Sequence, residues 1–151
     1  MTEQVLENSL HLKASALVTP KKELQMKQII STPNAPEAVG PYSQANAASG
    51  RAIYVTGQVS LDPASGKPTQ GDIEVQTTRV FENIAAILQA SGASFKDVVK
   101  VNVYLSDVAN FAKMNEVYRR FFTSDYPART TIQAVLPPGF LLMADVVAYI
   151  E

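Results

Sequence analysis

Arg129 is the residue best placed for chemistry in this chain, because it follows a proline-marked corner at Tyr126-Pro127 and begins a predicted strand. An arginine stays charged at any ordinary pH, and its planar guanidinium can donate two parallel hydrogen bonds to a carboxylate or a phosphate. A rigid corner before the strand would fix the direction of the side chain. The stretch predicts an anion-binding arginine, and the alternative is an ordinary exposed one.

The composition restricts which other groups could take part. The chain has no cysteine and a single histidine, His11. These counts exclude disulfides, thiolate nucleophiles, paired-histidine acid–base chemistry and the usual zinc ligand sets. Any catalysis must then use carboxylates, hydroxyls, arginine, backbone groups and water, so we expect neither a metal nor a cofactor.

Length and charge narrow the class of protein further. The 151 residues, of which 46% are hydrophobic, predict one domain at 27–151 after a flexible N-terminal extension at 1–26. Thirteen basic and fourteen acidic residues provide no overall field that attracts nucleic acid or anionic lipid, and no apolar run reaches the ~18 residues of a membrane helix. The extension contains no arginine, which favours a cytoplasmic location over the alternatives, mitochondria or plastids.

Two amphipathic helices are predicted from apolar residues that recur every three or four positions. The first is capped by Asp72 and runs to about Ala90, with Gly92 just past its end. The second begins near Asn110, and we assign its aromatic residues to the core: Phe111, Tyr118, Phe121 and Phe122. Each helix should bury one face against a sheet.

Five strands are predicted, at residues 43–48, 53–60, 99–105, 129–135 and 142–150. Ser49-Gly50 is a hairpin turn signal, so we expect the first two strands to pair. The loop at 136–140 is short enough to make the last two an antiparallel hairpin. The element order is β-β-α-β-α-β-β, which predicts an α+β domain with two helices on one face of a mostly antiparallel sheet.

The second predicted hairpin brings Asp145 into the candidate site. With regular pairing, Asp145 lies opposite Thr131 or Gln133 and shares a sheet face with Arg129. Its carboxylate could form a salt bridge with the arginine, or could orient a water beside a small anion held between them. The residues alone leave both roles open.

Two further features of the strands bear on the site. Gly57 interrupts the second strand, and such a glycine marks either a bulge or a place where a ligand comes close. The sheet face away from the helices is mixed in polarity and includes Tyr54, Asn102 and Tyr104. Faces of this kind are often covered by other subunits.

Several short motifs follow one another in a specific order: Ala35-Pro36, Gly40-Pro41-Tyr42-Ser43-Gln44, Thr56-Gly57-Gln58, Val99-Lys100-Val101, Asn115-Glu116-Val117-Tyr118, Pro127-Ala128-Arg129 and Leu136-Pro137. With these motifs the chain resembles the RidA/YjgF family of imine deaminases over residues 27–151. Each motif is weak alone, whereas the order and spacing of the set are specific. The resemblance implies a chorismate-mutase-like fold and a homotrimer with active sites between neighbouring subunits.

The resemblance also implies an activity, the hydrolysis of 2-iminobutanoate and 2-iminopropanoate to 2-keto acids and ammonia without a cofactor. In that role Arg129 holds the substrate carboxylate and Asp145 positions or activates water. The remaining substrate-binding positions implied by the resemblance are Tyr42, Gly57, Asn115 and Thr131. Many family members have cysteine in place of Thr131 and glutamate in place of Asp145.

Two other functions stay open at this point. The first is a non-catalytic trimer that binds small carboxylates or acts as a chaperone, with Arg129 kept for ligand capture. The second is an endoribonuclease that inhibits translation, an activity that the resemblance also brings with it. The balanced charge and the absence of histidine from residues 27–151 argue against the second.

Overall fold

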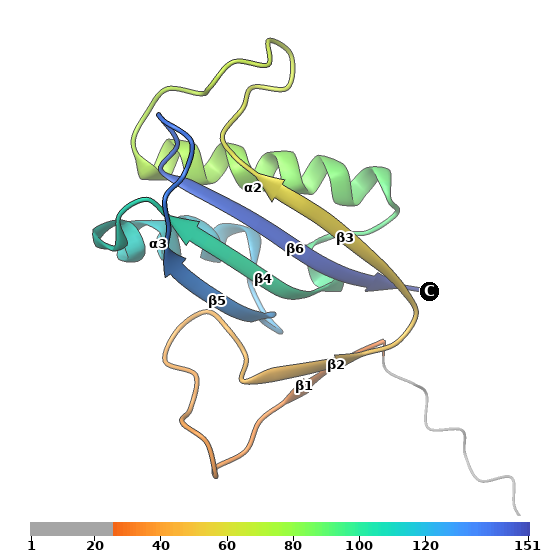
Figure 1. Ribbon diagram of the computed structural model, residues 1–151. Helices are drawn as coiled ribbons and strands as arrows, with labels where there is room; N and C mark the ends of the chain where they lie inside the picture. Colours follow the sequence, from red (N-terminus) through yellow and green to blue (C-terminus); the bar gives the residue numbers. More distant parts are fainter. Residues whose placement is uncertain (1–25) are drawn as a thin grey trace, which may run out of the picture.

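The computed structural model describes residues 26–151, so His11 and, apart from Met26, the predicted extension at 1–26 lie outside the described residues. Figure 1 shows two helices behind one face of a sheet, with a short two-stranded ribbon beside it. In chain order the longer elements are β1 (Lys27–Ile30), β2 (Ala45–Ala48), β3 (Arg51–Gln58), α2 (Ile73–Ala90), β4 (Val98–Leu105), α3 (Phe111–Phe121), β5 (Ala128–Gln133) and β6 (Leu142–Ile150). Single 3₁₀ turns at Phe95–Asp97 and Val108–Asn110 precede β4 and α3.

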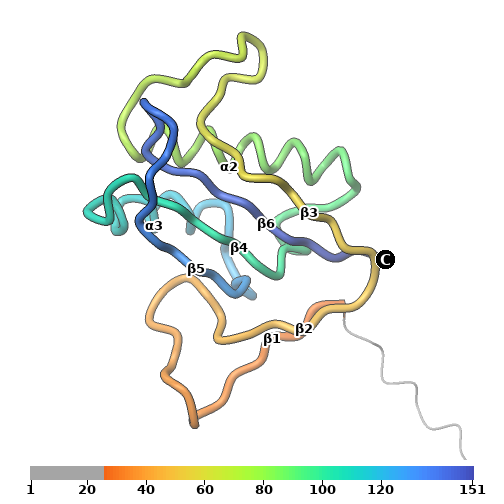
Figure 2. Tube along the Cα trace, in the orientation of Figure 1, coloured from red at the N-terminus to blue at the C-terminus, as the bar shows by residue number. Residues whose placement is uncertain are grey.

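The main sheet has the strand order β3-β6-β4-β5. The pairs β3–β6 and β6–β4 are antiparallel, whereas β4 and β5 are parallel. Both helices cover the same face, and the trace in Figure 2 shows β6 running between β3 and β4. The predicted α+β class with two helices on one face is confirmed, with β1 as an additional strand that the sequence analysis missed.

Both predicted hairpins are wrong. β2 pairs with β1 instead of β3, because Gly50 (φ 114°) turns the chain against the end of β6, where a Cβ atom would lie 2.2 Å from the Ile150 carbonyl oxygen. β5 pairs with β4, because the intervening helix α3 makes a parallel βαβ crossover. β6 then pairs with β3 and β4 at the centre of the sheet, where strands are more apolar than at an edge.

The predicted helices are confirmed, and their ends follow the expected capping. The Asp72 carboxylate accepts hydrogen bonds from the backbone amides of Glu74 (3.0 Å) and Val75 (3.1 Å). Gly92, with φ 78°, follows the last turn of α2. None of the described helices is long and apolar enough to cross a membrane, and residues 26–151 contain no group of three metal-ligating side chains.

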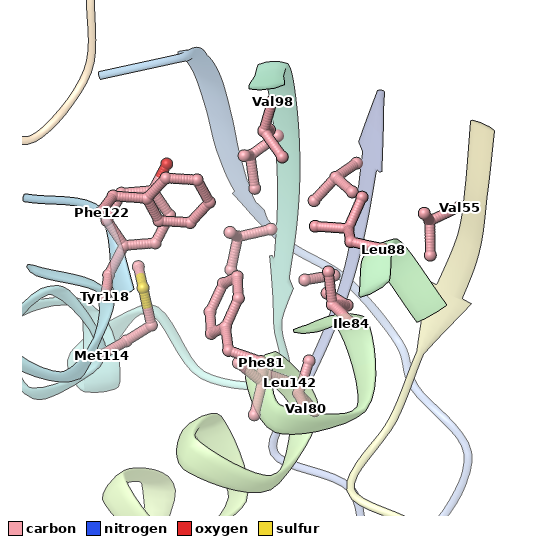
Figure 3. Packing of buried hydrophobic residues seen from close by; sticks show 14 of the residues in the cluster. Val55, Val80, Phe81, Ile84, Leu88, Val98, Met114, Tyr118, Phe122 and Leu142 are labelled. Atoms are coloured by element: carbon pink, nitrogen blue, oxygen red, sulfur yellow. The ribbon is translucent and has the colours of Figure 1, made fainter. Parts of the chain in front are cut away.

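Phe81 of α2 lies at the centre of the core between the helices and the sheet (Figure 3). Its ring is fully buried and packs against four other aromatic rings at centroid distances of 5.5 to 6.2 Å. Tyr118 and Phe122 stack at 4.4 Å beside it. This packing fixes α3 over the β4–β5 pair, and β5 carries Arg129.

Gln76 is a buried polar residue of α2 that fastens the loops at one end of the sheet. Its Oε1 accepts from the Ser60 hydroxyl (3.0 Å) and the Leu141 amide (2.9 Å), and its Nε2 donates to the Gly139 carbonyl (3.1 Å). Gln76→Leu would leave these groups unpaired, so we expect the free energy of unfolding to fall by about 2–3 kcal/mol. Chemical denaturation would measure this loss. Gln89→Leu, on the exposed side of the same helix, is the matched control, and equal stability of the two variants would contradict the expectation.

Candidate active site

The corner before β5 is fastened to the segment that precedes β2. Asp125 adopts a positive φ of 44°, and Pro127 follows it directly before the strand. The Ser43 amide donates to the Pro127 carbonyl (3.1 Å), and the Ser43 hydroxyl donates to the Tyr126 carbonyl. These hydrogen bonds therefore fix the position of Tyr42, the residue before Ser43, relative to Arg129 at the start of β5.

The Arg129 guanidinium lies on the helix side of the sheet, among aromatic rings from two elements. Its Nη1 donates to the Asn115 Oδ1 at 2.7 Å. Its central carbon lies 4.7 Å from the ring centroid of Tyr118, 5.6 Å from that of Phe111 and 5.8 Å from that of Tyr42. These distances are within the range of cation–π contacts, so the rings stabilise the charge without neutralising it.

Arg129 has no carboxylate partner among residues 26–151, where the ion pair that forms joins Arg79 and Glu82 at 3.0 Å. The side chain is half-buried, and this desolvation lowers the pKa of the guanidinium. Arginine nevertheless remains charged in proteins. A partly desolvated cation without a counterion attracts a small anion more strongly than an exposed arginine does.

Two buried hydroxyl groups lie on the same side of the sheet and find no hydrogen-bond partner among the described residues. They belong to Tyr118, under the guanidinium, and to Thr131, two residues after Arg129 on β5. Burial raises the pKa of the Tyr118 phenol, which therefore stays protonated at neutral pH. Unpaired buried hydroxyls are rare in folded proteins and point to a polar partner outside the chain, such as water or a ligand.

Asp145 does not share a face with Arg129, which corrects the prediction from the sequence. It pairs with Asn102 of β4, whereas Arg129 pairs with Val101, and consecutive strand residues point to opposite faces. The Asn102 Nδ2 donates to the Asp145 Oδ1 at 2.9 Å. A hydrogen bond to the same carboxylate raises the pKa of the Tyr104 hydroxyl. Asp145 thus belongs to a polar cluster on the open face of the sheet.

Within one copy of the chain, Gly57 also lies far from Arg129 in space. It is part of β3, at the edge of the sheet opposite to β5, where the register shifts between Val55 and Gln58. This irregularity is the bulge, one of the two alternatives that the sequence left open at Gly57. A Cβ atom on Gly57 would lie 2.8 Å from the Met143 Sδ, so the glycine accommodates that side chain. The structure brings together Arg129, Asn115, Tyr42 and Thr131, and it separates them from Gly57 and Asp145.

Tyr118 packs in the core and also contacts the guanidinium, whereas Phe111 contacts the guanidinium but is 39% exposed and lies outside the core, which corrects its predicted assignment. The apolar stripe of this helix predicts a core position for both residues, since such a stripe is usually buried. Their spacing carried the missing signal, because Phe111, Asn115 and Tyr118 follow one another at i, i+4 and i+7 on one helix face. Asn115, the polar residue on this helix face, indicates where the face borders the site.

The fold defines a class, the small α+β proteins of chorismate-mutase-like fold, and in this chain Arg129 lies on the edge strand β5 without a carboxylate partner among residues 26–151. Within this class, the chain belongs to the RidA/YjgF family, whose model, described as Endoribonuclease L-PSP, matches residues 32–150.

Individual relatives agree with this membership. A RutC family protein of Pyrococcus horikoshii is 48% identical over 127 residues, which cover 83% of this chain and all of that protein. The human 2-iminobutanoate/2-iminopropanoate deaminase is 40% identical over 124 residues, or 82% of this chain and 90% of the enzyme. The crystal structure of RidA from an Antarctic Psychrobacter is 43% identical with a TM-score of 0.64, and the match covers 82% of this chain and 99% of that one.

Proposed function

We propose that this protein hydrolyses small 2-imino acids, such as 2-iminobutanoate and 2-iminopropanoate, to 2-keto acids and ammonia. The observation that carries the proposal is the half-buried Arg129 guanidinium, which has aromatic neighbours and no carboxylate partner among the described residues. A 2-imino acid supplies the missing anion and places an electrophilic carbon directly beside it. The name of the human relative supports this choice of substrate.

In the proposed reaction Arg129 holds the carboxylate in a two-pronged hydrogen bond, while Asn115 keeps the guanidinium in place from the other side. Water adds to the imine carbon, a new C–O bond forms, and the nitrogen takes up a proton. The hydroxyl proton of the resulting tetrahedral adduct then passes to the nitrogen, the C–N bond breaks as the C=O bond forms, and ammonia leaves the 2-keto acid. Tyr42 forms one wall of the site, and the backbone at Thr131 borders the bound carboxylate.

We further propose that the complete site forms between neighbouring subunits of a homotrimer. The candidate residues fall into two groups, one beside β5 with Arg129 and one on the open sheet face with Gly57 and Asp145. A head-to-tail interface joins two different surfaces and closes into a ring, so it could bring the first group of one subunit to the second group of the next. The open face also exposes Tyr54 (76%) and Ile132 (50%), which supports its burial by another subunit.

Asp145 is the proposed group that orients the attacking water, and it would act on the substrate held by the neighbouring subunit's arginine. One oxygen of its carboxylate accepts from Asn102, which fixes the direction of the other. A positioned general base of this kind contributes about 10²–10⁴ to a rate.

The proposal is tested by generating imines in situ with threonine dehydratase and following their loss by semicarbazide trapping. We expect the wild-type protein to accelerate imine loss and Asp145→Asn to lower that acceleration by at least about tenfold. Glu82→Gln, a surface change on α2, serves as the control and should behave as wild type.

The possible results distinguish the role of Asp145 from the deaminase activity itself. Full activity of Asp145→Asn would remove this residue from the mechanism and leave the reaction itself in place. A folded wild-type protein without any acceleration would contradict the deaminase proposal and would leave a module that binds small carboxylates without turning them over.

A further inference from the structure

Tyr42 reaches Arg129 from a long exposed loop, and something must hold this loop in place. Residues 31–39 are all exposed, so no core contact fixes them. The loop joins β1 to β2 and returns toward the site through Gly40 and Pro41. Pro41, beside Tyr42, is buried, but the 31–39 part of the loop has no buried side chain and samples many conformations unless hydrogen bonds restrain it.

The carboxamide of Gln44 supplies these restraints. Its Oε1 accepts from the Thr32 amide at 2.7 Å. Its Nε2 donates to the carbonyl oxygens of Thr32 (3.1 Å), Ala35 (3.3 Å) and Pro36 (2.7 Å). One side chain thus ties together both ends of the 32–36 segment, which is the half of the loop farthest along the chain from Tyr42.

The backbone of Gln44 is anchored at the same time to the corner that precedes Arg129. Its neighbour Ser43 bonds to the carbonyls of Tyr126 and Pro127. In the second half of the loop, the Val39 amide donates to the Tyr42 hydroxyl (3.3 Å), and the Tyr42 amide donates to the Gly40 carbonyl (2.8 Å). Hydrogen bonds therefore restrain the loop at three places: Ser43 on the corner, Gln44 on the 32–36 segment, and Val39 on Tyr42.

We propose that Gln44 is a positioning residue: its carboxamide fixes the 32–36 segment and thereby holds Tyr42 against the Arg129 guanidinium. It does not touch the substrate. The inference rests on the proposed function for its link to imine hydrolysis, while the loop geometry is independent of that link. Loss of Gln44 should weaken binding of the anion more than it slows the chemical step, because Tyr42 lies against the Arg129 guanidinium, which holds the carboxylate and not the reacting carbon.

Two measurements on Gln44→Ala test this. In the imine assay we expect KM to rise about tenfold with kcat changed less than about threefold, and in calorimetry we expect 2-oxobutanoate, the reaction product, to bind about tenfold more weakly. Gln44→Glu should be no better than alanine, since it keeps the shape and loses the Nε2 donors. Asn83→Ala is the matched control, because its amide donates to a different exposed loop, at the Leu61 carbonyl (2.9 Å).

A double-mutant cycle decides whether Gln44 acts through Tyr42. Once Tyr42→Ala has been made, adding Gln44→Ala should weaken 2-oxobutanoate binding no further. Additive effects, or wild-type binding by Gln44→Ala or Gln44→Glu, would overturn the inference. If wild-type protein binds 2-oxobutanoate in a Gln44-dependent way but does not hydrolyse imines, the inference stands and the proposed function fails.

Discussion

Arg129→Ala is expected to lower kcat/KM for imine hydrolysis by about 10²–10³-fold. The substitution removes the cation that pairs with the substrate carboxylate, and such buried charge contacts are worth about 2–5 kcal/mol. It also leaves the Asn115 Oδ1 without its donor at 2.7 Å. The loss should appear in the semicarbazide assay while the protein remains folded by circular dichroism.

The conservative variant separates charge from geometry. Arg129→Lys keeps a cation but loses the fork that binds a carboxylate and Asn115 at once, so we expect an activity between that of wild type and of Arg129→Ala. Arg120→Ala, on the exposed side of α3, provides the control for removal of an arginine. Wild-type activity in Arg129→Ala would show that the substrate carboxylate is bound elsewhere.

Phe81→Ala should cause the largest loss of stability, about 3–5 kcal/mol in the free energy of unfolding. The ring is fully buried and contacts the rings of Phe95, Tyr118, Phe121 and Phe122, so its removal leaves a cavity between both helices. Urea denaturation monitored by tyrosine fluorescence would measure the change.

A graded pair of variants tests the cavity explanation. Phe81→Leu fills part of the space and should lose less stability than Phe81→Ala. Val75→Ala, at a position of α2 with 44% exposure, should change the unfolding midpoint little. A loss of the same size in Phe81→Leu and Phe81→Ala would indicate that specific ring contacts outweigh the cavity.

Local patterns in the sequence were sufficient to predict the helices and most of the strands. The apolar spacing of α2 and its Asp72 cap are properties of neighbouring residues, which a linear sequence displays directly. Arg129 could likewise be selected from its own stretch, because the corner and the strand start are local. Its partner Asn115 lies on the next element back along the chain, and only the packing of α3 on β5 brings the two together.

Strand pairing could not be predicted in the same way, because turn signals describe the path of the chain and not the neighbour of a strand. Gly50 does turn the chain, but it turns it out of one sheet and into another. The short loop before β6 permits a hairpin, yet the apolar character of β6 places it at the centre, between β3 and β4. The wrong prediction for Asp145 followed from this. Its strand pairs with β4 instead of β5, and in that pairing Asp145 lies on the sheet face opposite to Arg129.

The central position of β6 governs how late in folding the main sheet can be completed. β3 has β6 as its sheet partner, and β6 is the last of the described strands in chain order. Pairing joins residues as distant along the chain as Arg51 and Ile150, so a large loop must close before the sheet gains its contacts. Until β6 is in place, β3 has no partner in this sheet, and we expect β3 to join the β4–β5 pair late in folding.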